Sequence, residues 1–262
     1  MTDQTTEIQD QSVETVNPQG GSRVVLVCEH ASAFIPASFA NLGLDAAAAQ
    51  SHIAWDPGAR AVALRMSERL DAPLVAGKVS RLVYDCNRPP EAPDAMPARS
   101  EIFEVPGNAQ LTEAERSART ARYYMPFRAA LAQRVKSTVS AVIVTVHSFT
   151  PVYNGQDRAV EIGVLHDADT RLADALLSSA AQHTDMQVMR NEPYGPQHGV
   201  THTLTEHALP GGHLNVMLEI RNDLIATTAQ QEAMGDMIAA WLAQALTATD
   251  DAGNGGALPC SA

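Results

Sequence analysis

Short apolar runs recur along the chain and alternate with segments in which apolar residues have helical spacing. The runs are rich in Val, Leu and Ile and cover residues 23–28, 73–77, 81–85, 141–146, 161–165 and 215–220. Continuous runs of this kind predict strands that are buried on both faces of a parallel or mixed sheet. Helical spacing covers 58–70, 111–139 (with an interruption expected at Pro126), 169–181 and 228–246. This alternation predicts a three-layer α/β/α sandwich with a mixed, mostly parallel sheet.

The two ends of the chain differ from the middle in composition. Residues 1–22 are dominated by Gln, Thr, Glu and Asp, so we expect a disordered N-terminal segment. Residues 250–262 predict a flexible tail, which leaves 23–249 as a single domain. The N-terminus has no basic and apolar signal-peptide pattern, and no apolar stretch reaches the roughly 18 residues that span a bilayer. We therefore expect a cytoplasmic protein.

Charge and cysteine usage narrow the class of partner. The formal net charge is −12, so the chain is not expected to bind nucleic acid or an anionic membrane surface. A small anionic substrate would need a local group of arginines. The three cysteines are far apart in sequence, which argues against a disulfide framework or a structural zinc site.

Chemically capable side chains stand at the ends of three of the predicted strands. Glu29 and His30 follow the first run, His147 follows the run over 141–146, and Glu219 and Arg221 lie at the end of 215–220. In open α/β sheets, ligand sites form at the carboxyl ends of the strands. The pattern therefore predicts one site that combines residues far apart in sequence.

Two histidines and a carboxylate suggest a metal centre. A catalytic zinc site has His or carboxylate ligands and one open position for water. His30 and His147 are the expected imidazole ligands. The third ligand is either Asp56 or Glu29, and we favour Asp56. Glu29 adjoins His30, and neighbouring residues of an extended strand point to opposite faces.

Other residues supply the remaining functions of a hydrolase. Glu219 is the expected general base, which takes a proton from the attacking water and passes it to the leaving nitrogen. Arg81 is expected to stabilise the oxyanion. Asn87 and Arg88 are expected to hold a substrate carboxylate, because Arg binds this group bidentately. Arg221 and His207 are further substrate-binding candidates, and Asp85 is expected to orient a neighbouring His or Arg.

Six segments resemble the N-formylglutamate amidohydrolase family and together extend over roughly residues 23–246. They are VCEHAS (27–32), SHIAWD (51–56), SRLVYDCNRP (80–89), VHSFTP (146–151), NEPY (191–194) and LEIRNDLI (218–225). The resemblance implies a fold like that of zinc carboxypeptidases and aspartoacylases. It also implies metal-dependent hydrolysis, with zinc as the expected metal, of a small anionic N-acyl amino acid such as N-formylglutamate. Carboxypeptidase-like relatives have a Glu three residues after the first His, where this chain has Ala33, so the resemblance does not supply the third ligand.

Two other functions are considered beside this one. A metal-independent α/β hydrolase would need a nucleophile on a Gly-x-Ser-x-Gly turn, and Ser32 and Ser148 lack the flanking glycines. A carboxylate-binding protein that has lost its metal would account for Ala33. A Rossmann dehydrogenase is excluded, because no Gly-x-Gly-x-x-Gly follows a predicted strand. The sequence leaves the acyl group and the oligomeric state open.

Overall fold

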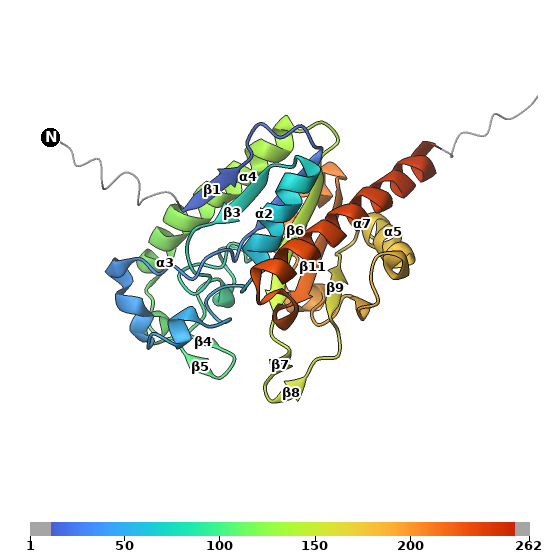
Figure 1. Ribbon diagram of the computed structural model, residues 1–262. Helices are drawn as coiled ribbons and strands as arrows, with labels where there is room; N and C mark the ends of the chain where they lie inside the picture. The colour runs from blue at the N-terminus through green and yellow to red at the C-terminus, as the bar shows by residue number, and fades with distance from the viewer. Residues whose placement is uncertain (1–11, 255–262) are drawn as a thin grey trace, which may run out of the picture.

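The computed structural model describes residues 12–254 and contains a seven-stranded central sheet (Figure 1). Its strands are β1 (Val13–Val16), β2 (Val24–Cys28), β3 (Leu74–Gly77), β6 (Val142–Phe149), β9 (Ile162–Leu165), β10 (Val188–Arg190) and β11 (Leu214–Arg221). Their order across the sheet is β1-β3-β2-β6-β11-β9-β10. The β3–β2, β2–β6, β6–β11 and β9–β10 pairs are parallel, and β1–β3 and β11–β9 are antiparallel. The predicted mixed, mostly parallel sheet is confirmed.

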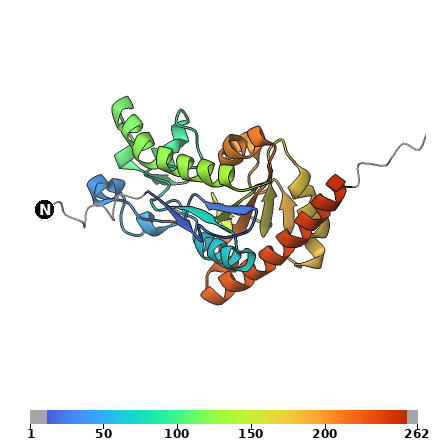
Figure 2. The same cartoon turned by 90° about the horizontal axis from the view of Figure 1, so that it is seen from above.

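Helices cover both faces of this sheet, which confirms the three layers (Figure 2). One layer contains α2 (Ala59–Leu70), α5 (Arg171–Ser179) and α7 (Thr228–Asn254). The other contains α3 (Glu113–Arg119), α4 (Met125–Ser137) and α6 (His202–His207). Two short hairpins, β4–β5 (Arg99–Ser100 and Phe103–Glu104) and β7–β8 (Val152–Tyr153 and Gln156–Asp157), project beyond the carboxyl ends of the parallel strands (Figure 1).

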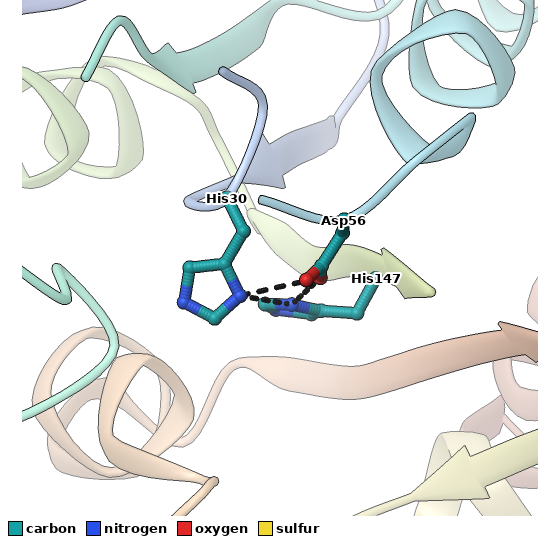
Figure 3. Close-up of side chains that lie close together, drawn as sticks. All are labelled: His30, Asp56 and His147. Atoms are coloured by element: carbon teal, nitrogen blue, oxygen red, sulfur yellow. Dashed lines mark hydrogen bonds and ion pairs between the residues drawn. The ribbon is translucent and has the colours of Figure 1, made fainter. Parts of the chain in front are cut away.

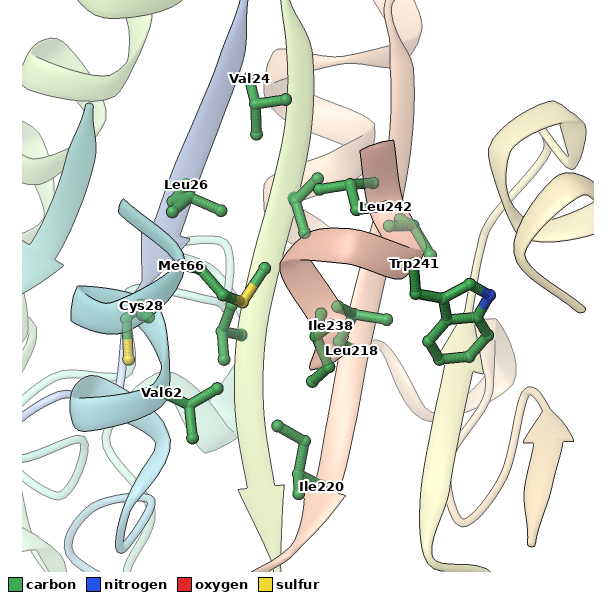
Figure 4. Close-up of a cluster of buried hydrophobic side chains, with 14 of the residues drawn as sticks. Val24, Leu26, Cys28, Val62, Met66, Leu218, Ile220, Ile238, Trp241 and Leu242 are labelled. Carbon is green, nitrogen blue, oxygen red and sulfur yellow. The ribbon is translucent and has the colours of Figure 1, made fainter. Parts of the chain in front are cut away.

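Alternation along the buried strands divides the interior into two apolar cores. In β2, Val24, Leu26 and Cys28 face the core under α2 and α7, whereas Val25 and Val27 face the core under α4. Both faces are apolar, which explains why the sequence shows continuous runs rather than an alternating pattern. The first core also contains side chains from α2 and α7 (Figure 4), namely Val62, Met66, Ile238, Trp241 and Leu242.

The apolar run over 81–85 does not form the predicted strand. Its residues form a turn, in which Val83 N donates to Ser80 O at 2.9 Å. The Ser80 hydroxyl accepts from Leu82 N at 3.1 Å and donates to Ala54 O at 2.8 Å. Leu82 and Val83 are fully buried. The apolar pattern therefore reported burial correctly, whereas local hydrogen bonds set the backbone conformation.

The interruption that the sequence predicts at Pro126 does not occur. Pro126 lies in the first turn of α4, directly after a π-helical turn at Thr120–Tyr124 that continues α3. Proline is tolerated in a first turn because its missing N–H needs no partner there. The predicted capping box of Thr112 and Glu115 at the start of α3 is present.

The expected boundaries of the ordered domain are too narrow at both ends. Residues 13–16, placed in a disordered segment, form β1 and pair antiparallel with β3. Glu14 on this strand forms an ion pair with Arg60 of α2, a contact that local composition cannot reveal. Helix α7 continues to Asn254, beyond the expected start of the tail. Residues 1–11 and 255–262 lie outside the described part of the chain.

Within the described residues, no helix has the length and apolar character that crossing a bilayer requires.

We predict that Trp241→Ala destabilises the protein more than any exposed change in α7. Trp241 is fully buried, and its indole N–H donates to Leu176 O at 2.9 Å, so the change removes both packing and a link between α7 and α5. The expected loss in unfolding free energy is about 3 to 5 kcal/mol, measured by urea denaturation. Thr247→Ala on the exposed side of α7 is the control, with an expected change of about 0.5 kcal/mol or less. Similar losses in both variants would contradict this account of the core.

Candidate metal centre and active site

Three predicted ligands meet at the carboxyl edge of the sheet. His147 lies near the end of β6, and His30 follows the adjacent parallel strand β2. Asp56 reaches them from the loop before α2, where its backbone N–H donates to His30 O at 3.0 Å. Ser148 N donates to the Asp56 carboxylate at 3.3 Å and fixes its orientation. All three ligand candidates are buried.

The three side chains point toward one another (Figure 3). Asp56 Oδ2 lies 3.2 Å from His30 Nδ1 and 2.9 Å from His147 Nδ1, and the two Nδ1 atoms are 3.2 Å apart. Ligand atoms on a tetrahedral zinc with bonds near 2.1 Å are separated by about 3.4 Å. Two nitrogens and one carboxylate oxygen in this triangle therefore match the donor set and spacing of a divalent metal site.

Each imidazole has a second carboxylate on its other ring nitrogen. His30 Nε2 lies 2.7 Å from Asp85 Oδ1, and His147 Nε2 forms an ion pair with Glu29 Oε2 at 3.1 Å. Ligating histidines commonly donate this N–H to a carboxylate, which orients the ring and leaves the other nitrogen free for a metal. Asp85 therefore orients His30, as the sequence indicated. Glu29 faces the nitrogen of His147 that points away from the triangle, so the geometry favours Asp56 over Glu29 as the third ligand.

Glu29 directly follows β2 and continues the alternation of Val25 and Val27, so it faces the side of the sheet to which His147 points. A Cβ atom on Gly77 of the neighbouring strand would lie 2.3 Å from Glu29 O, so only glycine permits this approach. The other Glu29 oxygen accepts a hydrogen bond from the Thr203 hydroxyl at 2.5 Å. Thr203 belongs to α6 and has no sequence signal that would mark it as part of a site.

The charges around the two imidazoles favour a bound cation. Glu29, Asp56 and Asp85 are all buried next to them. Burial by itself raises the pKa of Asp56, but the charge of His30 and the hydrogen bonds from both histidines outweigh it and hold the pKa below its usual range. Burial lowers the pKa of His147, whereas the Glu29 carboxylate raises it and prevails. The site thus attracts positive charge, either protons or a metal ion.

Glu219 provides an acidic group beside these ligands. In the parallel register of β11 and β6 it lies directly opposite His147, so the two side chains share one face of the sheet. Its Oε2 is buried and has no hydrogen-bond partner among the described residues. Burial raises the pKa of Glu219 to about 7. A carboxyl group with a pKa near neutrality can both accept and release a proton.

Arg81 contacts two of the carboxylates that surround the imidazoles. Its guanidinium donates to Asp85 Oδ2 at 2.9 Å and is 3.5 Å from Asp56 Oδ1. The side chain is 30% exposed, so it remains accessible to a small molecule while two carboxylates hold it. Arg81 therefore lies beside the candidate metal centre, and its role as oxyanion stabiliser stays a prediction.

Asn87 and Arg88 have polar partners within the protein. The Asn87 amide donates to Val200 O at 2.6 Å and accepts from Thr203 N at 3.0 Å. Arg88 is buried, where it pairs with Asp94 at 2.6 Å and donates to Asn87 O at 2.9 Å. These contacts hold the loops around the site together, and substrate contact by either residue stays a prediction.

Arg221 and His207 are not members of the ligand triangle, and their contact with a substrate stays a prediction. Arg221 pairs with Asp223 at 2.8 Å and lies 3.4 Å from Glu161, so its charge is balanced within the protein. His207 ends α6, and burial lowers its pKa to about 4, which keeps the imidazole neutral near pH 7.

The fold and donor set define an α/β/α protein with a candidate metal centre at the carboxyl edge of its sheet. Comparison with known proteins identifies the family. The N-formylglutamate amidohydrolase family model matches residues 22–226, so the chain belongs to this family, as the sequence resemblance indicated. No curated protein matches the chain.

Two solved structures are similar over nearly the whole chain. The crystal structure of gene product Atu2144 from Agrobacterium tumefaciens is 52% identical, with a TM-score of 0.91, and the match covers 93% of this chain and 98% of that one. The N-formylglutamate amidohydrolase from Ralstonia eutropha JMP134 is 19% identical, with a TM-score of 0.55, over 93% and 99% of the two chains. At this lower identity the second likeness shows the fold alone.

We predict that Asp56→Ala and Glu29→Gln weaken zinc binding to different extents. Glu29→Gln removes the charge that orients His147, so zinc affinity should fall by about 10- to 100-fold. Asp56→Ala removes a ligand and should cost more. Competition with a chromophoric chelator measures both affinities. Asp236→Ala, a surface carboxylate on α7 that pairs with Arg65, is the control and should bind zinc like the wild type. A larger loss in Glu29→Gln than in Asp56→Ala would identify Glu29 as the ligand instead.

Proposed function

We propose that the protein is a metal-dependent amidohydrolase that cleaves the amide of a small N-acyl amino acid, such as N-formylglutamate. The observation that carries this proposal is the convergence of His30 Nδ1, His147 Nδ1 and Asp56 Oδ2 beside Glu219. Membership of an amidohydrolase family supports amide hydrolysis as the reaction. The acid and base chemistry of that reaction requires the kind of unpaired carboxyl group that Glu219 provides.

Zinc is the metal that we propose for the site. Two imidazole nitrogens and one carboxylate oxygen form a donor set that zinc accepts, and His30, His147 and Asp56 would hold it. A divalent metal in such a site lowers the pKa of water and polarises the acyl carbonyl.

Glu219 is the proposed general base and acid. It would accept a proton from the attacking water and then donate it to the leaving amine nitrogen, so that the amine departs as a neutral group. The elevated pKa allows both steps near neutral pH. Its unpartnered oxygen means that no internal hydrogen bond must be broken first.

Arg81 is the proposed electrostatic stabiliser of the oxyanion. Its contacts with Asp85 and Asp56 fix the guanidinium before substrate binds, so little reorganisation is needed when negative charge develops on the carbonyl oxygen. We propose that Asn87, Arg88 and Arg221 support the surrounding loops, because their polar groups already have partners within the protein.

The serine candidates do not support a metal-independent hydrolase. Ser32 Oγ accepts from Phe34 N at 3.1 Å, and Ser148 Oγ donates to Pro57 O at 2.8 Å. Among the described residues, neither hydroxyl has a hydrogen bond to a histidine, although a serine nucleophile needs one for activation.

Metal analysis together with a substrate screen tests the proposed function. Purified protein should contain zinc or another divalent metal, and a chelator should abolish hydrolysis until metal is restored. The substrate panel consists of N-formyl, N-acetyl and N-succinyl amino acids, with released amine as the readout. Metal-free protein that hydrolyses at the full rate would contradict the metal dependence. Metal-free protein that binds carboxylates but hydrolyses no amide after zinc, cobalt or manganese is added would indicate a binding protein.

Glu219→Gln is predicted to reduce kcat by about 100- to 10,000-fold, because glutamine can neither accept nor release the transferred proton. Metal content, measured by elemental analysis, should stay at the wild-type level, since Glu219 is not among the proposed ligands. Glu232→Gln, an exposed change on α7, is the matched control for the chemical substitution. A Glu219→Gln enzyme with nearly wild-type turnover on the identified substrate would assign the base to another residue.

A further inference from the structure

Arg158 follows the β7–β8 hairpin and is surrounded by aromatic rings. Its Cζ lies 4.5 Å from the ring centre of Tyr153, 4.8 Å from that of Tyr194 and 5.5 Å from that of Phe149. The Tyr194 hydroxyl accepts a hydrogen bond from the guanidinium at 2.9 Å. Cations are attracted to the faces of aromatic rings, so these contacts hold the guanidinium in one place.

No carboxylate pairs with Arg158 among the described residues, in contrast to the other arginines near the site. Arg81, Arg88 and Arg221 each form at least one ion pair. The chain has 30 acidic and 18 basic residues, so acidic partners are abundant. A guanidinium has five N–H donors, and Arg158 uses two of its groups, toward Tyr194 and toward Thr150 O at 3.4 Å. It thus retains donors for an anion.

The strand register places Arg158 next to the metal centre. Phe149 lies two residues after His147 on β6, so both side chains point to the same face, about 6.6 Å apart along the strand. On the neighbouring strand β11, Glu219 lies opposite His147, and Arg221 lies opposite Phe149. The Arg158 guanidinium packs on Phe149, which lies two residues farther along the sheet than the pair of His147 and Glu219. This spacing suits a small molecule whose amide is at the metal and whose carboxylate is a few bonds away.

Backbone contacts fix Arg158 at the base of its hairpin. Its N–H donates to Pro151 O at 2.8 Å, and its carbonyl accepts from the Arg221 guanidinium at 3.2 Å. The hairpin tip is held as well, because Asn154 N donates to Glu101 of the β4–β5 hairpin at 3.1 Å. A preorganised cation binds an anion at a lower entropic cost than a mobile one.

The loop that carries Tyr194 can approach the site because of one glycine. Gly163 of β9 pairs with Glu219 of β11, and a Cβ atom at this position would lie 2.0 Å from Glu192 O. The close approach brings the loop over the strands that carry the proposed base. Tyr194 therefore connects Arg158 to the edge of the sheet at which Glu219 lies.

We propose that Arg158, clamped by Phe149, Tyr153 and Tyr194, binds a carboxylate of the substrate and determines the preference for acidic N-acyl amino acids. This inference rests on the proposed function. Arg158 would then be the cation that an acidic protein needs to bind an anionic substrate. Arg88, the residue expected in this role, is paired with Asp94.

The test compares Arg158→Met with wild type on three substrates. These are N-formyl-L-glutamate, N-formyl-L-glutamine, which lacks the side-chain charge, and the α-amide of N-formyl-L-glutamate. Arg158→Met should lower kcat/KM on the doubly charged substrate by on the order of 100-fold, chiefly through KM. N-formyl-L-glutamine and the α-amide each lack one of the two carboxylates. The loss in kcat/KM should be much smaller on whichever of them lacks the carboxylate that Arg158 binds. Equal losses on all three substrates would overturn the inference and leave Arg158 with a structural role.

Two further variants keep the result interpretable. Arg158→Lys retains the charge but not the planar fork, so it should show the same selectivity change in weaker form, even if Arg158→Met is poorly folded. Arg69→Met also removes one positive charge, from an exposed residue that pairs with Asp236, and should leave the substrate preference as in wild type.

A binding measurement separates this inference from the proposed function. Calorimetry with L-glutamate and L-glutamine, performed on metal-loaded wild type and Arg158→Met, requires no turnover. The wild type should prefer glutamate, and the variant should lose that preference. Wild-type protein that hydrolyses none of the three substrates would count against the proposed function. Hydrolysis by wild type with an unchanged preference in both variants would count against Arg158 alone.

Discussion

The mutual approach of two imidazoles and a carboxylate in a buried place is the interaction on which the rest of the site depends. Polar groups are costly to bury unless they have partners, and the imidazoles here lie against three carboxylates. Asp85 and Glu29 occupy the outer nitrogens of His30 and His147, so that both inner nitrogens face Asp56. Removal of any carboxylate would leave a buried imidazole without its partner. The same arrangement that satisfies the side chains also prepares them for a cation.

Strand register converts this local chemistry into a catalytic arrangement. β2, β6 and β11 are adjacent and parallel, so residues at their carboxyl ends gather at one edge of the sheet. His147 and Glu219 point to the face covered by α4 and α6, whereas Val146, Leu218 and Ile220 pack in the apolar core on the opposite face. Gly77 and Gly163 complete the arrangement, because only glycine lets neighbouring backbone pass so close to the strands. The sheet thus acts as a rigid frame for groups supplied by several loops.

Electrostatics divide the arginines around the site into two kinds. Arg81 lies against Asp56 and Asp85, close to where charge would develop in the reaction. Arg158 is held instead by aromatic faces and a phenol, and it forms no ion pair within residues 12–254. In a chain of net charge −12, aromatic clamping is a physical way to keep a cation available for an anionic ligand.

The sequence by itself determined the layered α/β architecture and the three residues of the candidate metal centre. Continuous apolar runs identified the buried strands. A polar or charged residue at the end of such a run is rarely without a function, and this pattern identified His30, His147 and Glu219 as candidates. The tertiary structure decided those backbone conformations and side-chain partners that depend on residues far apart in the sequence. The run over 81–85 is a turn that the Ser80 hydroxyl links to Ala54 O in another loop, and residues 13–16 form a strand because β3 offers an edge. The tertiary contacts also favour Asp56 over Glu29 as the third ligand, and they give Asn87 and Arg88 partners within the protein. They bring Arg158 and Tyr194 close to the site. Spacing along the chain cannot reveal any of these contacts, because it does not show which side chains meet.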